Sequence, residues 1–135
     1  MEKQKNIPLV SFVLLANGVI DLFAAIALFF PVLKLPLPGY TSYTNQLAFV
    51  AGGWGIATLT LGIGRIWASH KSEFYWIMVT LGLVEGVFLA MYSLINVIFL
   101  GISLLQVMLP LIVGSVFGIL YFVSLLVLLR LDRPD

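Results

Sequence analysis

The chain has 135 residues, of which 61% are hydrophobic and 10% are charged. Soluble domains carry about 25% charged residues, so the composition excludes an ordinary soluble protein and indicates a membrane protein. A net charge of +1 supplies no basic surface that could displace counterions, which argues against nucleic-acid binding. The chain has no cysteine and one histidine, so it cannot by itself build a thiolate site or a histidine-rich metal or haem centre. We therefore expect no metal and no cofactor.

Four stretches of the sequence are long and apolar enough to cross a bilayer, which takes about 20 residues. The predicted spans are 9–30, 46–68, 74–95 and 104–130. The first is too long for a signal peptide and no cleavage-type sequence follows it closely, so it is predicted to remain as a helix. Pro31, Pro36, Pro38 and Gly39 separate it from the second span. The sequence thus predicts one all-α domain over residues 1–135, a bundle of four transmembrane helices.

Two helix starts carry local signals. Thr44 or Asn45 is a plausible N-cap of the second helix. Ser103 followed by Gln106 has the spacing of a capping box, whereas Pro110 is typical of a first helical turn. We favour the start at Ser103, which places Pro110 inside the last helix.

The distribution of basic residues predicts the orientation of the spans. One end of the predicted bundle carries six of the seven basic residues, and only Lys34 falls at the other end. The six are Lys3, Lys5, Arg65, Lys71, Arg130 and Arg133. Trp67 and Trp76 lie at the membrane boundary of this basic end, and we interpret them as interface or lipid anchors. Arg65 is interpreted as a third anchor, with a snorkelling side chain. Both termini and the 69–73 loop are therefore predicted to be cytoplasmic.

Small residues recur four apart in three of the predicted helices. The pairs and triplets are Ala48/Gly52, Ala51/Gly55, Gly82/Gly86/Ala90 and Gly114/Gly118. This spacing lets helix backbones approach closely within a membrane. It predicts close packing inside the bundle and leaves open contact with a partner or a second copy.

Two acidic residues lie within the spans, at matching offsets from the starts of the first and third helices. Asp21 and Glu85 are therefore predicted to lie at nearly the same depth, because both helices run in the same direction. Asn17 precedes Asp21 by one turn on the same face. Thr58 and Ser115 also fall near this layer. These five residues form the predicted ligand-binding or proton-handling site.

The two carboxyl groups need compensation, since an ionised side chain at the bilayer centre costs about 2.5–3.5 kcal/mol. Arg65 sits near the cytoplasmic end of its span, so the sequence argues against a buried salt bridge. The carboxyls then either are protonated or share a proton, bind an inorganic cation or organic amine, or face a basic residue of another subunit. Alternatively, each is a neutral acid that only holds helices together. No catalytic residues are predicted, because no nucleophile, base and oxyanion donor come together.

Both connections at the non-cytoplasmic end are apolar, VLKLPLPGY in the first and INVIFLGISLL in the second. Exposed loops are ordinarily polar. These segments are expected either to lie among lipid headgroups or to be covered by another protein, which favours a subunit of a complex.

The four-helix layout, the short basic loop and the second span AFVAGGWGIATLTLGIGRIW resemble the DoxX-like small membrane proteins. The resemblance implies a four-helix fold and, for some members, a place in quinone-linked oxidoreductases. The EXPERA group of sterol isomerases and amine-binding receptors also uses intramembrane acids, but the aromatic and histidine pattern of the isomerases is missing. Small multidrug transporters are shorter, have their essential acid in helix one, and in their dual-topology members lack this charge bias.

The leading prediction is a non-catalytic accessory subunit of a larger membrane complex, of the oxidoreductase kind if the DoxX-like resemblance holds. The alternative is a binding or proton- or cation-handling protein for a hydrophobic or cationic ligand, centred on Asp21 and Glu85. An isomerase-type enzyme is a third hypothesis. The expected partners are the lipid bilayer and either other membrane subunits or a second copy, and no nucleic acid.

Overall fold

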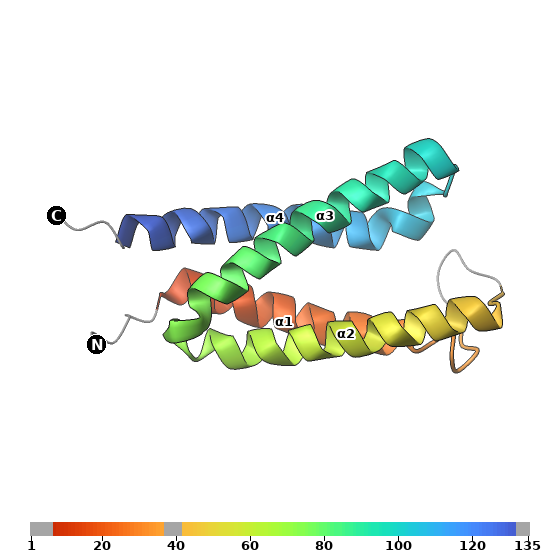
Figure 1. The fold of residues 1–135 in the computed structure, drawn as a ribbon, viewed down its shortest axis with the longest axis horizontal. Coiled ribbons are helices and arrows are strands. Elements are labelled where there is room, and N and C mark those ends of the chain that lie inside the picture. Colours follow the sequence, from red (N-terminus) through yellow and green to blue (C-terminus); the bar gives the residue numbers. More distant parts are fainter. Residues whose placement is uncertain (1–6, 37–41, 132–135) are drawn as a thin grey trace.

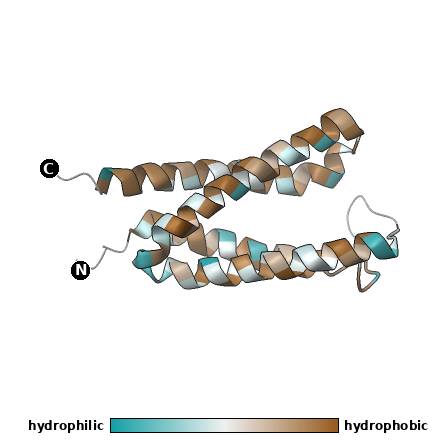
Figure 2. Ribbon diagram, viewed as in Figure 1, coloured by the Kyte–Doolittle hydropathy of each residue, from teal (hydrophilic) through white to brown (hydrophobic). Residues whose placement is uncertain are grey.

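The computed structural model describes residues 7–36 and 42–131. The regular elements within these residues are the helices α1 (Pro8–Leu28), α2 (Asn45–Ser69), α3 (Tyr75–Leu100) and α4 (Leu104–Leu131), with one 3-10 turn, η1 (Ser72–Phe74), before α3. The four α-helices are long and apolar enough to cross a membrane, and Figure 2 shows apolar positions along all of them. The prediction of an all-α chain with four such helices is confirmed. Lys3, Lys5, Pro38, Gly39 and Arg133 lie outside the described residues.

The helix starts follow the local signals. Thr44 caps α2, because its Oγ1 accepts a hydrogen bond of 3.1 Å from the Leu47 backbone N–H. The backbone N–H of Ser103 donates to Gln106 Oε1 at 3.3 Å, and α4 begins at the next residue. Pro110 consequently lies inside α4.

The second outer connection differs from the prediction, because α3 continues to Leu100 and only residues 101–103 are non-helical. Asn96 lies within the helix, where its Nδ2 donates to the Tyr92 carbonyl oxygen at 2.7 Å. The helix ends at Gly101, whose φ of 64° is the left-handed conformation that favours glycine. The apolar segment read as a loop is therefore mostly the last turns of α3.

The helices form two hairpins, α1 with α2 and α3 with α4, and contacts within each hairpin are far more extensive than contacts between them. Figure 1 shows α3 leaving the α1–α2 pair obliquely from the connection at residues 70–74. We call this side, where α1 starts and α4 ends, the hinge end, and the opposite side the open end. The fold is thus two joined hairpins and not an evenly packed bundle.

Close backbone approach inside each hairpin uses small residues, of which Gly86 and Gly118 were predicted for this role and Gly18 and Gly62 were not. A Cβ on Gly86 would lie 2.8 Å from the Gly118 Cα, and a Cβ on Gly18 would lie 2.8 Å from the Gly62 carbonyl oxygen. Neither position can take a side chain without a shift of backbone. Gly53, in contrast, would meet nothing within 4 Å. The glycines of the α3–α4 and α1–α2 seams therefore serve packing within the chain.

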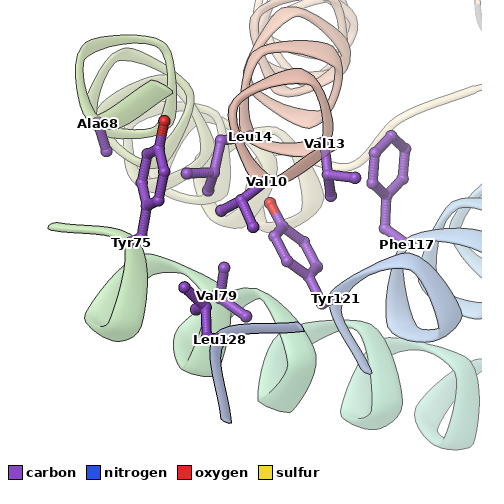
Figure 3. Close-up of a cluster of buried hydrophobic side chains, with 9 residues drawn as sticks. All are labelled: Val10, Val13, Leu14, Ala68, Tyr75, Val79, Phe117, Tyr121 and Leu128. Atoms are coloured by element: carbon purple, nitrogen blue, oxygen red, sulfur yellow. The ribbon is translucent and has the colours of Figure 1, made fainter. Parts of the chain in front are cut away.

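The buried apolar core lies toward the hinge end, where all four helices contribute to it. Its members are Val10, Val13, Leu14, Ala68, Tyr75, Val79, Phe117, Tyr121 and Leu128. Figure 3 shows Tyr121 reaching from α4 toward Val10 of α1, so this side chain crosses from one hairpin to the other. The core fixes the hairpins at this end and positions the polar residues that lie beside it.

Candidate functional site

A buried arginine joins the two intramembrane acids. Nη1 of Arg65 donates to Oδ2 of Asp21, and Nη2 donates to Oε2 of Glu85. Arg65 is 1% exposed, so the arginine partner of both ion pairs is buried. One guanidinium on α2 thereby links α1 of its own hairpin to α3 of the other. We call Asp21, Arg65 and Glu85 the charge cluster.

The interpretation of Arg65 as a snorkelling anchor, too remote for a salt bridge, is wrong. Cα–Cβ bonds tilt toward a helix N-terminus, so this long side chain extends back from the hinge end toward the middle of α2. Asp21 lies close by, since a Cβ on Gly62 would be 3.0 Å from the Asp21 Cβ, and Gly62 is within one turn of Arg65. Counting residues located the Arg65 backbone but not the direction of its side chain.

Both carboxylate oxygens of Asp21 accept a hydrogen bond within the chain. Asn17 Nδ2 donates to Oδ1 of Asp21 at 2.9 Å, and Arg65 occupies the other oxygen, Oδ2. Asn17 and Asp21 are both buried. The structure therefore brings Asn17 into contact with Asp21, as their spacing of one turn indicates, and engages both oxygens of this buried carboxylate.

Glu85 differs from Asp21 in exposure and in bonding. Its side chain is 40% exposed, against 8% for Asp21. Oε2 is paired with Arg65, whereas Oε1 accepts no hydrogen bond from residues 7–36 or 42–131. A carboxylate oxygen of this kind can accept a hydrogen bond from an ammonium, amide or hydroxyl donor. Glu85 is thus the accessible member of the charge cluster.

The charge cluster carries one surplus negative charge when its members are ionised, because two carboxylates face one guanidinium. In the described part of the chain, its ion pairs involve no further cation. A buried charge that is not balanced is costly in a protein interior and in hydrocarbon. The surplus therefore calls for a proton or for a cationic group from outside the described residues.

Tyr121 completes the surroundings of Arg65. The Arg65 Cζ lies 5.8 Å from the centre of the Tyr121 ring, within the range of a cation–π contact. The ring fills the space over Gly82, where a Cβ would overlap it. The buried Tyr121 hydroxyl has no hydrogen-bond partner among the residues that the structure describes. Sequence reasoning missed Tyr121; a tyrosine deep inside the last span, away from the aromatic belts, was the available signal.

Thr58 and Ser115 take no part in the hydrogen bonds described for the charge cluster. Thr58 is half-buried, and Ser115 is exposed. Ser115 instead lines an apolar groove of about 380 Å³ along the α3–α4 seam, beside Gly86 and Gly114. Helical spacing places residues at a height along the helix, but their rotation about the axis decides which of them meet.

Trp67 and Trp76 lie toward the hinge end. Trp67 is 51% exposed and its ring centre is 4.6 Å from that of Phe74. Trp76 is partly buried and packs against the core. The anchoring role of these two residues stays a prediction.

Comparisons with protein families, with curated proteins and with solved structures found no match for this chain. The resemblance to DoxX-like proteins stays a prediction.

Proposed function

We propose that this chain is a non-catalytic, multi-pass membrane protein that binds a cationic group at Glu85. The observation that supports the proposal is the asymmetry of the charge cluster. Asp21 uses both oxygens inside the chain, whereas Glu85 presents one oxygen outward from a cluster with a surplus negative charge. A cation at Glu85 would balance the charges and supply the missing donor.

The charge cluster also holds Glu85 in place before a ligand arrives. Arg65 bonds to Asp21 and lies within cation–π range of the Tyr121 ring, so the Glu85 carboxylate has a fixed partner. Preorganisation of this kind lowers the ordering cost of binding. The role assigned to Arg65 is therefore to position Glu85, while Glu85 makes the contact with the ligand.

The test compares Glu85→Gln with Glu73→Gln, the same change at an exposed residue outside the charge cluster. The probe is 4-fluorobenzylamine, with 4-fluorobenzyl alcohol as its uncharged counterpart, followed by fluorine NMR on the purified protein in lipid nanodiscs. A hydrogen bond to a charged group contributes about 1.5–3 kcal/mol, so Glu85→Gln should weaken amine binding at least about tenfold. Equal binding of amine and alcohol, or full binding by Glu85→Gln, would contradict the proposal.

We further propose that the termini and the hinge end face the cytoplasm. Arg65 no longer counts toward the charge bias, since its guanidinium is buried, but Lys3, Lys5, Lys71, Arg130 and Arg133 still oppose Lys34 alone. Short basic segments are retained on the cytoplasmic side.

The chain has no native cysteine, so single cysteines report on topology without background. A membrane-impermeant thiol reagent added to intact cells should label a cysteine at Ser42 and leave one at Ser72 unlabelled. Permeabilised cells should show both positions labelled, as a control for reactivity. The reverse pattern on intact cells would overturn the proposed orientation.

An accessory subunit of a larger membrane complex remains the second candidate. It is favoured by the end of α3, where the successive residues Ile98, Phe99 and Leu100 are 69%, 76% and 68% exposed. A basic residue on a partner helix would balance the negative charge of Glu85 in the same way as a small cation. A stoichiometric complex that survives purification of the wild type and is lost from Glu85→Gln would favour this candidate.

A further inference from the structure

One stripe of α3 connects Glu85 to a groove at the open end of the molecule. Leu89, Tyr92 and Asn96 follow Glu85 at intervals of four, three and four residues, which keeps them on one face of the helix. This face is turned toward α2, because Glu85 pairs with Arg65 of that helix. At a rise of 1.5 Å per residue, Leu89 lies about 6 Å and Asn96 about 16 Å beyond Glu85 along the axis.

The groove has a volume of about 310 Å³ and lies between Trp54 of α2 and the α3–α4 seam. Its lining includes Leu89, Tyr92, Ser93, Asn96 and Pro110. Trp54 and Tyr92 are 66% and 67% exposed, so their rings are available to a ligand and are not part of the core. A volume near 300 Å³ is at the small end of the range for small-molecule sites.

Two buried polar side chains of the groove already bond to the backbone of α3. The Ser93 hydroxyl donates to the Leu89 carbonyl oxygen at 2.8 Å, and Asn96 Nδ2 donates to that of Tyr92 at 2.7 Å. The groove lining carries no ionisable side chain apart from the tyrosine phenol. The groove therefore suits an uncharged, largely apolar part of a ligand. The negative charge lies outside the groove, at Glu85.

We infer that the cationic ligand is an elongated amphiphile, with an ammonium head at Glu85 and an apolar tail lying along α3 in the groove beside Trp54 and Tyr92. This rests on the proposed function, since it assigns the head to Glu85. Charge complementarity selects the occupant: the free oxygen of Glu85 favours a cationic head, and the neutral groove one turn away accepts its tail. In a bilayer the tail exchanges one apolar environment for another, so ring contacts and packing must supply its share of the affinity.

The test adds a longer probe, 4-(4-fluorophenyl)butylamine, to the short 4-fluorobenzylamine, and truncates each groove ring in turn. Trp54→Ala and Tyr92→Ala should each weaken binding of the long amine by about fivefold, from the usual worth of an aromatic contact, and leave the short amine unchanged. Trp67→Ala, at the hinge end, is the matched control. Comparing variants with one probe cancels the partition of that probe into lipid.

The outcomes separate the two proposals. If both amines need Glu85 but neither ring truncation affects the long amine, the cation site stands and the groove assignment fails. If neither amine needs Glu85 and neither ring truncation has an effect, both proposals fail. If the ring truncations weaken binding of the long amine but Glu85→Gln does not, the groove holds an uncharged tail. If a copurified phospholipid is lost from Tyr92→Ala and is not displaced by the long amine, the groove holds a lipid. The inferred occupant is then wrong.

Discussion

Replacing Arg65 by glutamine is expected to destabilise the protein by about 3–5 kcal/mol, the usual cost of removing one partner from a buried ion pair. Arg65 is 1% exposed and bonds to carboxylates on two other helices. Its loss leaves the Asp21 carboxylate buried beside only Asn17, and removes a link between hairpins that otherwise share few contacts. The free energy of unfolding can be measured by circular dichroism as SDS is added to the protein in mild detergent.

Arg130→Gln is the matched control, because Arg130 is exposed in the last turn of α4. Surface substitutions of this kind ordinarily change stability by no more than about 0.5 kcal/mol. Equal stability of Arg65→Gln and Arg130→Gln would show that the two ion pairs of Arg65 do not stabilise the fold. The positioning role assigned to Arg65 would then fall.

Asp21→Asn and Glu85→Gln are each expected to cost no more than about 1 kcal/mol, whereas the double variant is expected to cost about 3–5 kcal/mol. Each single change removes the surplus negative charge and leaves Arg65 with one carboxylate partner. The double change leaves a buried guanidinium with no counter-charge in the cluster, which is the strongly destabilising case. The same unfolding measurement on the four proteins gives a double-mutant cycle.

The coupling energy from that cycle should be at least about 1 kcal/mol and positive, meaning that the double variant loses more than the sum of the single ones. Glu73→Gln in place of Glu85→Gln supplies the control cycle, since Glu73 lies in η1 and is exposed. That control cycle should be additive. Strict additivity between Asp21 and Glu85 would contradict the view that Arg65 couples the two acids energetically.

The sequence by itself determined the features that depend on local chemistry and on length along one axis. Apolar stretches of membrane-spanning length predicted four helices, and the side chains of Thr44 and Gln106 marked two of their starts. It also singled out Asp21 and Glu85, because an acid within an apolar helix is unusual wherever its partner lies. The spacing of Asn17 and Asp21 by one turn was enough to indicate that the two meet.

Only the tertiary structure decided which side chains from different helices come together. Asp21, Glu85, Thr58 and Ser115 were predicted for one layer by counting residues. Of these only the two acids share a cluster, and they are joined by Arg65. Arg65 was misplaced because its long side chain runs back along α2. Tyr121 was missed because its place beside Arg65 depends on the packing of α4 against Gly82. Periodicity gives height along a helix, whereas rotation, crossing angle and side-chain direction are set by contacts with the other helices.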